Sequence, residues 1–304
     1  MSRRFRFGLQ VTDGSAEELR ASAVAAEAAG FDVLSSFDHL GRHWAPLAPL
    51  LAAALWTERL RVCPLVLNND FHHPVHLARE LASMDLLMGG RLEVGIGAGH
   101  AFTEYAQVGQ QFDASAIRKS RLAEAVEVLR PLLEGERVSY EGRHYQLKEA
   151  QVQHPQQPHV PIMVAVNGHH ALAHAAQHAD IVGLTMLGRT LADGHSHEAR
   201  WQSDRLDRTV AWIREAARDR WPSVELNALV QVVRVTDDRR KAAEELAARV
   251  PGLDPRDALE TPFVALGTHD EIADHLLACR ERWGVSYFTV RDATAFAPVI
   301  ERLA

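Results

Sequence analysis

The sequence predicts an α/β fold, and within that class a (β/α)8 barrel of the TIM type with inserted segments. Short apolar, β-branched runs alternate with longer helical patterns along the 304 residues. Eight such units in a chain of about 300 residues fit a closed barrel. The strand runs are also apolar almost throughout, as in parallel sheets that are buried on both faces. An open doubly wound sheet is the alternative.

Each strand is predicted from a short apolar run between turn-forming residues. The predicted strands are Phe5–Val11, Asp32–Phe37, Arg61–Leu67, Leu92–Gly97, Pro161–Val166, Ile181–Met186, Leu226–Val235 and Ser286–Val290. Each helix is predicted from a longer amphipathic pattern that follows a strand. The predicted helices are Ala16–Ala29, Pro46–Glu58, Val75–Leu87, Ala116–Glu134, Ala171–His178, Asp204–Asp219, Asp238–Val250, Asp270–Trp283 and a last one, Phe296–Leu303.

Two segments interrupt this alternation. Glu134–Gln153 is predicted to form an exposed hairpin, because Glu141-Gly142 is a turn dipeptide between alternating runs. Gly188–Ala199 is predicted to be a polar loop after the sixth strand. Both are expected to be surface insertions on the functional side of the barrel. No Pro/Gly/Ser-rich linker divides the chain, so a single domain over residues 1–304 is expected.

The composition limits the class of protein. The chain is 47% hydrophobic and 24% charged, which is ordinary for a globular protein. Its net charge of −7, without a long basic run, argues against a nucleic-acid partner. No membrane span is expected, because no apolar run reaches roughly 18 residues, and the first residues do not resemble a signal peptide. Cys63 and Cys279 lie far apart, which indicates a reducing compartment and so a cytoplasmic protein.

Three alternating glycines, Gly95, Gly97 and Gly99, lie at the end of the fourth predicted strand. A dinucleotide-binding G-x-G-x-x-G motif does not fit, because it belongs to the first strand and His100 occupies its third glycine position. Tight packing between strand and loop would explain one or two of the glycines. Three of them, followed by Glu104, favour a ligand close to the backbone. We expect the glycines to keep side chains out of the space of this ligand.

Polar residues follow several other strand ends, where barrel enzymes have their active sites. These stretches are "FDHLGRHW" (37–44), "NND" (68–70), "GHAFTE" (99–104) and "NGHH" (167–170). Backbone N–H groups at the helix start after Asn167-Gly168 would bind a phosphate. Asn69 and Asp70 could instead form a turn, and Glu104 could cap the helix that follows it. The sequence therefore predicts a barrel mouth with amides, carboxylates, an imidazole and a phosphate site.

The 17 histidines suggest a metal site. His170, His174 and His178 are spaced by four, on one face of a predicted helix, and His195 and His197 form an H-x-H motif. Metal-dependent barrel hydrolases place H-x-H after their first strand, however, where this chain reads "LQVTDG". Metal ligands also need supporting partners, which are not evident in the sequence. We interpret the helix as a solvated histidine face and predict no metal site.

Longer segments resemble the luciferase-like monooxygenase family, also called the bacterial luciferase family. The segments are "AAEAAGFDVLSSFDHL" (25–40), "HHPVHLARELASMDLLMGGRLEVGIGAG" (72–99), "ERVSYEGRHYQLKEA" (136–150), "PIMVAVNG" (161–168) and "ALGTHDEIADHLLACRERWGVSYFTVRD" (265–292). The resemblance covers nearly the whole chain, and Pro74–Gly99 is its most specific part. Met88, where a serine is common, is a minor departure. Within the family, the chain is most similar to the branch that uses the deazaflavin coenzyme F420 rather than FMN.

The resemblance implies a bacterial luciferase-like barrel and a role for each strand end. A non-prolyl cis peptide would lie within Pro64–Asn68, near Leu65-Val66, behind the cofactor ring. His39 would be catalytic and Glu104 a proton donor. Asp38 would complete the catalytic set and could tune His39, although neighbours on a strand point to opposite faces. The implied cofactor-binding residues are Leu65, Val66, Asn68, Gly97, Ala98, Gly99, Asn167, Gly168 and His169.

The implied activity is hydride transfer between F420 and a small organic substrate. The cofactor supplies the hydride chemistry and the protein manages one proton. Two alternatives stay open: an FMN-dependent two-component monooxygenase and a non-catalytic barrel that binds a flavin or deazaflavin. The family resemblance also implies a homodimer. Arg189 is the single cation of the 188–199 segment, which argues against recognition of a substrate phosphate there.

Overall fold

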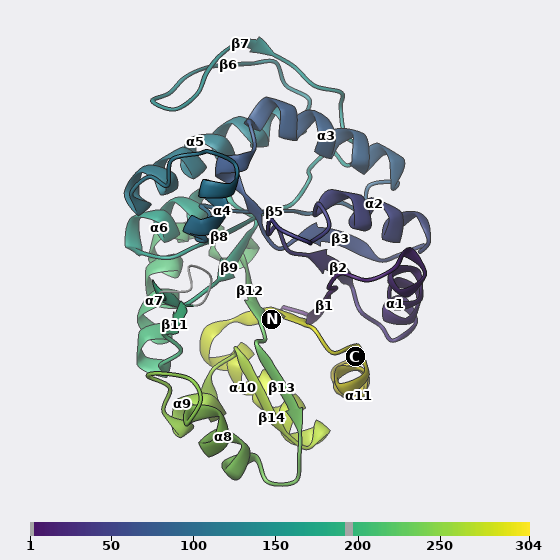
Figure 1. Cartoon of the computed structure of the whole chain (residues 1–304), viewed down its shortest axis with the longest axis vertical. Coiled ribbons are helices and arrows are strands. Elements are labelled where there is room, and N and C mark those ends of the chain that lie inside the picture. The colour runs from purple at the N-terminus through teal and green to yellow at the C-terminus, as the bar shows by residue number, and fades with distance from the viewer. Residues whose placement is uncertain (1–2, 192–196) are drawn as a thin grey trace.

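A parallel β-barrel lies at the centre of the computed structural model, which describes residues 3–191 and 197–304 (Figure 1). Its strands are β1 (Arg6–Gln10), β2 (Val33–Ser36), β3 (Arg61–Pro64), β4 (Leu67–Asn68), β5 (Val94–Gly97), β8 (Ile162–Val166), β9 (Ile181–Leu184), β12 (Glu225–Leu229) and β15 (Val285–Val290). These nine strands of the described chain occupy eight positions, because β3 and β4 are two pieces of one strand.

The sheet closes where the third strand position meets the fourth. The hydrogen-bonded order is β3-β2-β1-β15-β12-β9-β8-β5-β4, so the two pieces of the third strand lie at its two ends. Val62 of β3 also bridges Leu92, just before β5. The N–H of Glu93 donates to the carbonyl of Val62 at 2.8 Å. The predicted closed barrel is therefore confirmed, and the open doubly wound sheet is excluded.

Helices connect the strands and surround the barrel. They are α1 (Ala16–Ala28), α2 (Leu47–Leu55), α3 (Pro74–Leu87), α4 (Phe102–Gln107), α5 (Ser115–Leu133), α6 (His169–His178), α7 (Ser203–Ala217), α8 (Arg239–Ala247), α9 (Pro255–Glu260), α10 (His269–Trp283) and α11 (Ala293–Leu303). Capping boxes begin α1, with Ser15 and Glu18, and α10, with Thr268 and Glu271. Each predicted helix is present, whereas the short helices α4 and α9 were not predicted.

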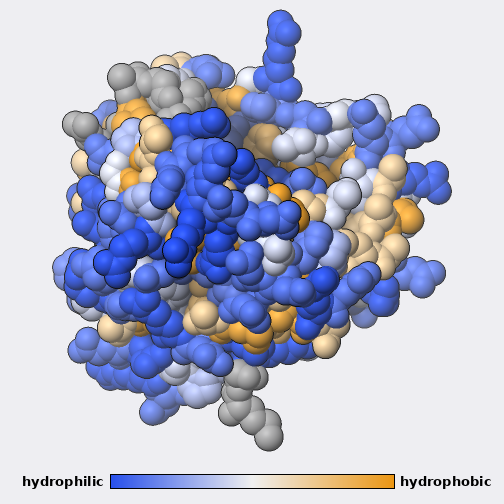
Figure 2. All heavy atoms as spheres, turned by 90° about the horizontal axis from the view of Figure 1, so that it is seen from below, coloured by the Kyte–Doolittle hydropathy of each residue, from blue (hydrophilic) through white to orange (hydrophobic). Residues whose placement is uncertain are grey.

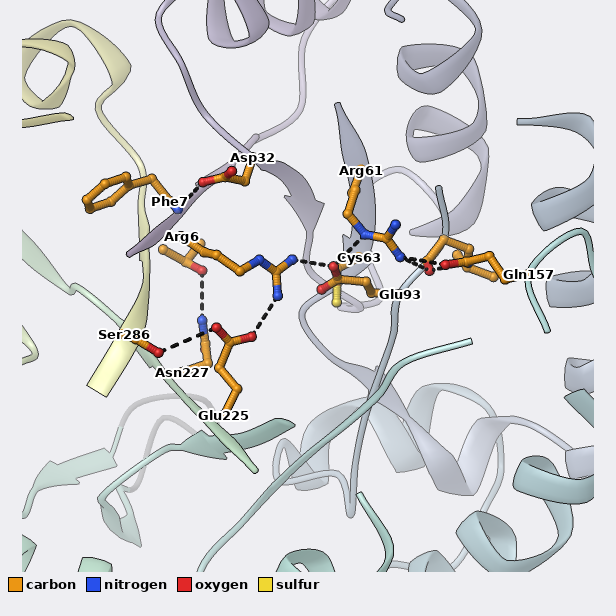
Figure 3. A network of polar contacts seen from close by, with 12 residues as sticks. Arg6, Phe7, Asp32, Arg61, Cys63, Glu93, Gln157, Glu225, Asn227 and Ser286 are labelled. Carbon is orange, nitrogen blue, oxygen red and sulfur yellow. Dashed lines mark hydrogen bonds and ion pairs between the residues drawn. The ribbon is translucent and has the colours of Figure 1, made fainter. Parts of the chain in front are cut away.

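A buried network of charges lies at the N-terminal ends of the barrel strands (Figure 3). Arg6 donates to Glu225 at 2.7 Å and also pairs with Glu93. Arg61 donates to Glu93 at 2.7 Å, and the Glu93 side chain is only 1% exposed. Burial lowers the pKa of Arg6, but the two carboxylates outweigh this effect and hold the pKa above its ordinary value. Opposite charges thus pair at the end of the barrel away from the predicted site.

The seventh predicted strand, Leu226–Val235, is two strands in the structure. The N–H of Val230 still bonds to Thr289 of β15, whereas the N–H of the next residue, Gln231, donates to the carbonyl of Phe263 at 2.8 Å. The chain then forms β13 (Val232–Val235), which pairs in parallel with β14 (Val264–Gly267) outside the barrel, near α8 and α10 (Figure 1). Apolar residues stand on both sides of Gln231, and one polar residue does not by itself mark a change of sheet, so the break was not predicted; β14 was not predicted either.

Both inserted segments form antiparallel pairs. β6 (Val138–Glu141) pairs with β7 (Gln146–Ala150), which confirms the predicted hairpin; Figure 1 shows it projecting beyond α3 and α5. The predicted polar loop is wrong, because β10 (Leu187–Thr190) pairs with β11 (His197–Ala199). The polar side chains predicted a loop, but the backbone N–H and C=O groups of β10 and β11 need hydrogen-bond partners and find them in each other. Residues 192–196, and with them His195 of the H-x-H motif, lie outside the described residues.

The outer surface has the polar character expected from the composition (Figure 2). No helix within the described ranges has the length and apolar character needed to cross a membrane. Figure 2 shows the molecule from below the view of Figure 1. This face is mostly hydrophilic, with smaller hydrophobic patches between hydrophilic side chains. Cys63 and Cys279 are both buried as free thiols.

Candidate functional site

A pocket of about 1110 Å³ opens at the C-terminal ends of the barrel strands. It is lined by residues at the ends of β1, β2, β4, β5, β8, β9 and β12. Predicted site residues that line it are Asp38, His39, Leu65, Val66, Asn68, Gly97, Ala98, Gly99, Glu104, Asn167 and Gly168. The fold thus brings nearly all of the predicted residues to one pocket, at the strand ends where barrel enzymes have their active sites.

The third strand is interrupted at one wall of the pocket. The peptide bond between Leu65 and Val66 is cis, at the predicted position. A Cβ on Gly95 would overlap the carbonyl oxygen of Pro64, and a Cβ on Gly97 would lie 2.8 Å from Cγ2 of Val66. These glycines therefore make room for the neighbouring strand. The expectation that they clear space for a ligand is wrong for Gly95, which does not line the pocket.

His39, in the loop after β2, meets Glu104, in the first turn of α4, at the pocket wall. Nδ1 of His39 and Oε1 of Glu104 share a hydrogen bond of 2.7 Å. The Glu104 side chain is 3% exposed and that of His39 is 36% exposed. A buried carboxylate bonded to one ring nitrogen fixes the orientation of the imidazole. Nε2 of the ring is then the atom that can exchange a proton with a bound molecule.

Asp38 has a structural role in the same loop. Its Oδ2 accepts a hydrogen bond from the N–H of Asn68 at 2.8 Å and lies 3.4 Å from Nε2 of His72. These contacts tie the loop after β2 to the end of β4. Glu104, not Asp38, provides the carboxylate that bonds the imidazole of His39, so the expected tuning by Asp38 stays a prediction.

Tyr105, which was not predicted, lies behind Gly99. Its hydroxyl donates to Oδ2 of Asp70 at 3.0 Å and lies 3.3 Å from Oδ1 of Asn68. Burial and the Asp70 carboxylate raise the pKa of Tyr105, so the phenol stays protonated. Gly99 has a φ of +71°, and a Cβ there would overlap the Tyr105 hydroxyl. The third glycine is thus needed both for its backbone conformation and for packing against Tyr105.

A positively charged corner lies where α5 and α6 begin. Gly168 caps α6 with a φ of 93°, and a Cβ on it would lie 3.4 Å from Nζ of Lys119. Arg118 and Lys119 line the pocket beside it. Burial, with a smaller effect of Arg118, lowers the pKa of Lys119. A helix N-terminus next to cationic side chains suits an anion such as a phosphate.

Two further arginines line the pocket, Arg200 after β11 and Arg291 after β15. Arg291 donates to the side-chain oxygens of Gln10 at 2.9 Å and Gln231 at 3.1 Å. Two neutral amides therefore position its guanidinium, and burial lowers its pKa. Gln10 in turn donates to the carbonyl of Leu65 at 3.2 Å. This chain of hydrogen bonds links Arg291 to the interrupted third strand.

The sequence profile of the luciferase-like monooxygenase family matches residues 3–287. The chain belongs to this family. It is 35% identical over 156 residues to an F420-dependent glucose-6-phosphate dehydrogenase from Amycolatopsis mediterranei, covering 48% of this chain and 46% of the relative. The protein of the same name from Microbacterium testaceum is 33% identical over 173 residues, with coverages of 54% and 51%. The chain thus spans about half the length of the curated relatives it matches.

A solved structure supports the luciferase-like fold along the whole chain. The coenzyme F420 dependent tetrahydromethanopterin reductase from Methanopyrus kandleri superimposes with a TM-score of 0.79, covering 99% of this chain and 100% of that one. At 20% sequence identity, this likeness shows the fold alone. The barrel expected from the family resemblance is confirmed.

His169 is the one predicted site residue that does not line the pocket of this luciferase-like barrel. It is the first residue of α6, and its ring packs edge-on against Trp212 of α7, with centroids 5.2 Å apart. The prediction that His169 binds the cofactor is therefore corrected. Its ring points toward α7 and not into the pocket.

The donor set of this family member fits a flat cofactor that carries a phosphate. Leu65 and Val66 supply an apolar wall, and Gly97, Ala98 and Gly99 line the pocket next to it. The corner at Lys119 supplies positive charge for a phosphate. Flavins and deazaflavins share these two features, so the fit holds for both groups.

Several pocket residues were missed by the sequence analysis. Gln10 and Arg291 lie at the ends of the first and last barrel strands, so the strand-end rule could have found them. Arg118 and Lys119 lie within a helix, where basic residues usually face solvent. The sequence carries no signal that sets these two apart.

Proposed function

We propose that this chain is an F420-dependent oxidoreductase that transfers a hydride between the deazaflavin and a small organic substrate. The observation that carries the proposal is the 2.7 Å hydrogen bond between His39 and Glu104 at the wall of the strand-end pocket. Curated relatives at 35% and 33% identity are named F420-dependent dehydrogenases. Their names favour the deazaflavin over FMN.

The bound deazaflavin would supply the hydride chemistry, and the protein would position it. Residues proposed to surround the ring are Leu65, Val66, Asn68, Gly97, Ala98 and Gly99, all of which line the pocket. Asn167, Gly168 and Lys119 are proposed to hold the phosphate. The N-terminus of α6 and the Lys119 ammonium both provide positive potential there.

His39 is proposed to give or take the proton that accompanies hydride transfer. Imidazole changes charge near neutral pH, and His39 is exposed enough to meet a substrate. Glu104 would hold the ring in one tautomer and balance the positive charge of the protonated form. The family resemblance implies that Glu104 is a proton donor. We propose instead that His39 and Glu104 act as one hydrogen-bonded pair, in which His39 faces the substrate.

The substrate is proposed to carry a negatively charged group. Arg200 and Arg291 line the pocket, and the hydrogen bonds of Arg291 to Gln10 and Gln231 go to neutral amides. Guanidinium groups bind carboxylates and phosphates through two hydrogen bonds. The sequence-based expectation considered only Arg189 and argued against a substrate phosphate; the anion site proposed here uses Arg200 and Arg291 instead.

Anaerobic turnover assays test the proposed function. The purified chain with F420 would be screened against reducible and oxidisable organic molecules, with neutral and anionic members of each kind. A change in deazaflavin absorbance with at least one molecule would support the proposal. Consumption of reduced FMN with oxygen would instead favour the FMN-dependent monooxygenase. Binding of a cofactor without turnover in either panel would favour a non-catalytic barrel.

We also propose that the chain forms a homodimer through helices on one side of the barrel. Leu55 at the end of α2 is 60% exposed and Leu87 at the end of α3 is 63% exposed, and Val24 on α1 is 48% exposed. Apolar side chains exposed on successive helices suit a contact with a second copy. Sedimentation velocity should give a dimer for the wild type and a shift toward monomer for Leu87→Asp. A monomeric wild type would contradict the proposal.

A further inference from the structure

Three potential metal ligands meet on the outside of the barrel, between α5 and α6. Glu127 of α5 and His174 and His178 of α6 each offer one donor atom, and these atoms all lie within 4.8 Å of one another. His174 and His178 are four residues apart, and their rings stack with centroids 4.2 Å apart. Nε2 of His174 lies 3.0 Å from Oε1 of Glu127. The group is thus already gathered before any ion binds.

We propose that Glu127, His174 and His178 bind one divalent transition-metal ion of the Zn²⁺ type. Imidazole nitrogens suit Zn²⁺, Ni²⁺ and Cu²⁺, and Zn²⁺ sites often combine two histidines with one glutamate. Glu127 and His178 are exposed and His174 is half-buried. Water can therefore reach the ion and complete a four-coordinate site. The proposal is independent of the activity proposed for the strand-end pocket.

A second residue supports the carboxylate ligand. The hydroxyl of Tyr140, on β6 of the hairpin, donates to Oε2 of Glu127 at 2.7 Å. This bond fixes the orientation of the carboxylate and leaves Oε1 for the ion. Such supporting hydrogen bonds are typical of metal ligands. The sequence showed no such partner, because Tyr140 lies in a separate insertion and reaches Glu127 only through the fold.

The position of the site links it to the walls of the pocket. α5 carries Arg118 and Lys119 near its start, and Gly168 caps α6, and all three line the pocket. An ion held by Glu127 on one helix and two histidines on the other would cross-link these helices. Because the ion binds only the folded arrangement, it should stabilise the folded state as its concentration rises.

Isothermal titration of the metal-free chain with Zn²⁺ tests the proposal. The variants are His174→Ala, His178→Ala, Glu127→Gln and Tyr140→Phe. His170→Ala is the matched control, because it removes an exposed histidine of the same helix that is not among the three ligands. This control also accounts for weak binding by the many other histidines. Thermal unfolding without metal should show that each variant is folded.

We expect one equivalent of Zn²⁺ for the wild type and for His170→Ala, and loss of that equivalent in both ligand-histidine variants. Glu127→Gln and Tyr140→Phe should weaken binding by about tenfold or more, as losses of a carboxylate ligand or its support do. Zn²⁺ should raise the unfolding midpoint of the wild type but not that of His178→Ala. Equal Zn²⁺ affinity for the wild type and His178→Ala, with both proteins folded, would overturn the proposal.

Discussion

Nδ1 of His39 lies 2.7 Å from Oε1 of Glu104, although the two residues are 65 positions apart in the chain. His39 follows β2 and Glu104 lies in the first turn of α4, after β5, so closure of the barrel brings them together. The carboxylate is buried and the imidazole is partly exposed at the pocket. This difference in exposure supports the proposal that the ring exchanges the proton and that the carboxylate positions the ring.

Replacement of His39 separates binding from chemistry. His39→Ala should leave the dissociation constant for F420 nearly unchanged and lower kcat by about 10²–10⁴, the usual size of an acid–base contribution. Fluorescence titration measures the first quantity and steady-state kinetics the second. His170→Ala removes a histidine that does not line the pocket and should change neither. A loss of F420 binding in His39→Ala with no separate effect on kcat would contradict the assignment.

Substitution of Gly95 tests the packing of the interrupted strand. A Cβ on Gly95 would overlap the backbone oxygen of Pro64, which cannot move as a flexible side chain does. Gly95→Ala should therefore lower the free energy of unfolding by about 1–3 kcal/mol or more, as overpacking does. Gly109→Ala, which meets open space at a φ of +68°, should cost about 1–2 kcal/mol from backbone conformation alone. Urea unfolding measures the free energy of unfolding of both variants. A smaller loss of stability for Gly95→Ala than for Gly109→Ala would contradict the close contact between Gly95 and Pro64.

Replacement of Lys119 tests the phosphate corner. Lys119→Ala removes the ammonium beside the N-cap of α6 and should weaken cofactor binding by about 10–100-fold, the equivalent of one hydrogen bond to a charged group. The matched variant Lys148→Ala, on the exposed strand β7, should bind as the wild type does. Cofactor titration at two salt concentrations should also show a weaker salt dependence for Lys119→Ala. Unchanged affinity would place the phosphate elsewhere.

Asp180 should make the stability of the protein depend on pH. It accepts hydrogen bonds from the N–H of Ile162 at 2.8 Å and from Arg130 at 2.5 Å. Burial raises the pKa of Asp180, but Arg130 and the hydrogen bonds outweigh it, so the pKa lies below its ordinary value. A lowered pKa contributes stability above the unfolded-state pKa of about 3.9, and this contribution is lost as pH falls through the folded-state pKa.

Asp180→Asn should therefore lower the free energy of unfolding by about 1–3 kcal/mol near neutral pH, the range for hydrogen bonds to charged groups. The difference from the wild type should shrink as pH falls below about 4. Urea unfolding across this range measures both proteins. A difference that stays constant down to the lowest pH would show that the carboxylate charge is not the cause.

The barrel could be predicted from the sequence because each buried strand is an apolar run followed by a helical pattern. The break at Gln231 could not, since apolar residues resume directly after it in β13 while the hydrogen-bond partner of the backbone changes. His39 and Gly97 could be expected at the pocket because barrel enzymes have their active sites at the C-terminal ends of the strands. That expectation could not pair His39 with Glu104, because side-chain direction in a loop follows from packing that the pattern does not contain.

Cofactor titration of the wild-type chain tests the central claim most directly. Oxidised F420 and FMN would be added separately while intrinsic tryptophan fluorescence is followed, with Trp201 lining the pocket as an internal reporter. We expect quenching that saturates with F420 at a concentration at least tenfold lower than with FMN, a difference of about 1.4 kcal/mol. Tighter binding of FMN would contradict the proposed deazaflavin enzyme and move the chain to the flavin-dependent members of its family.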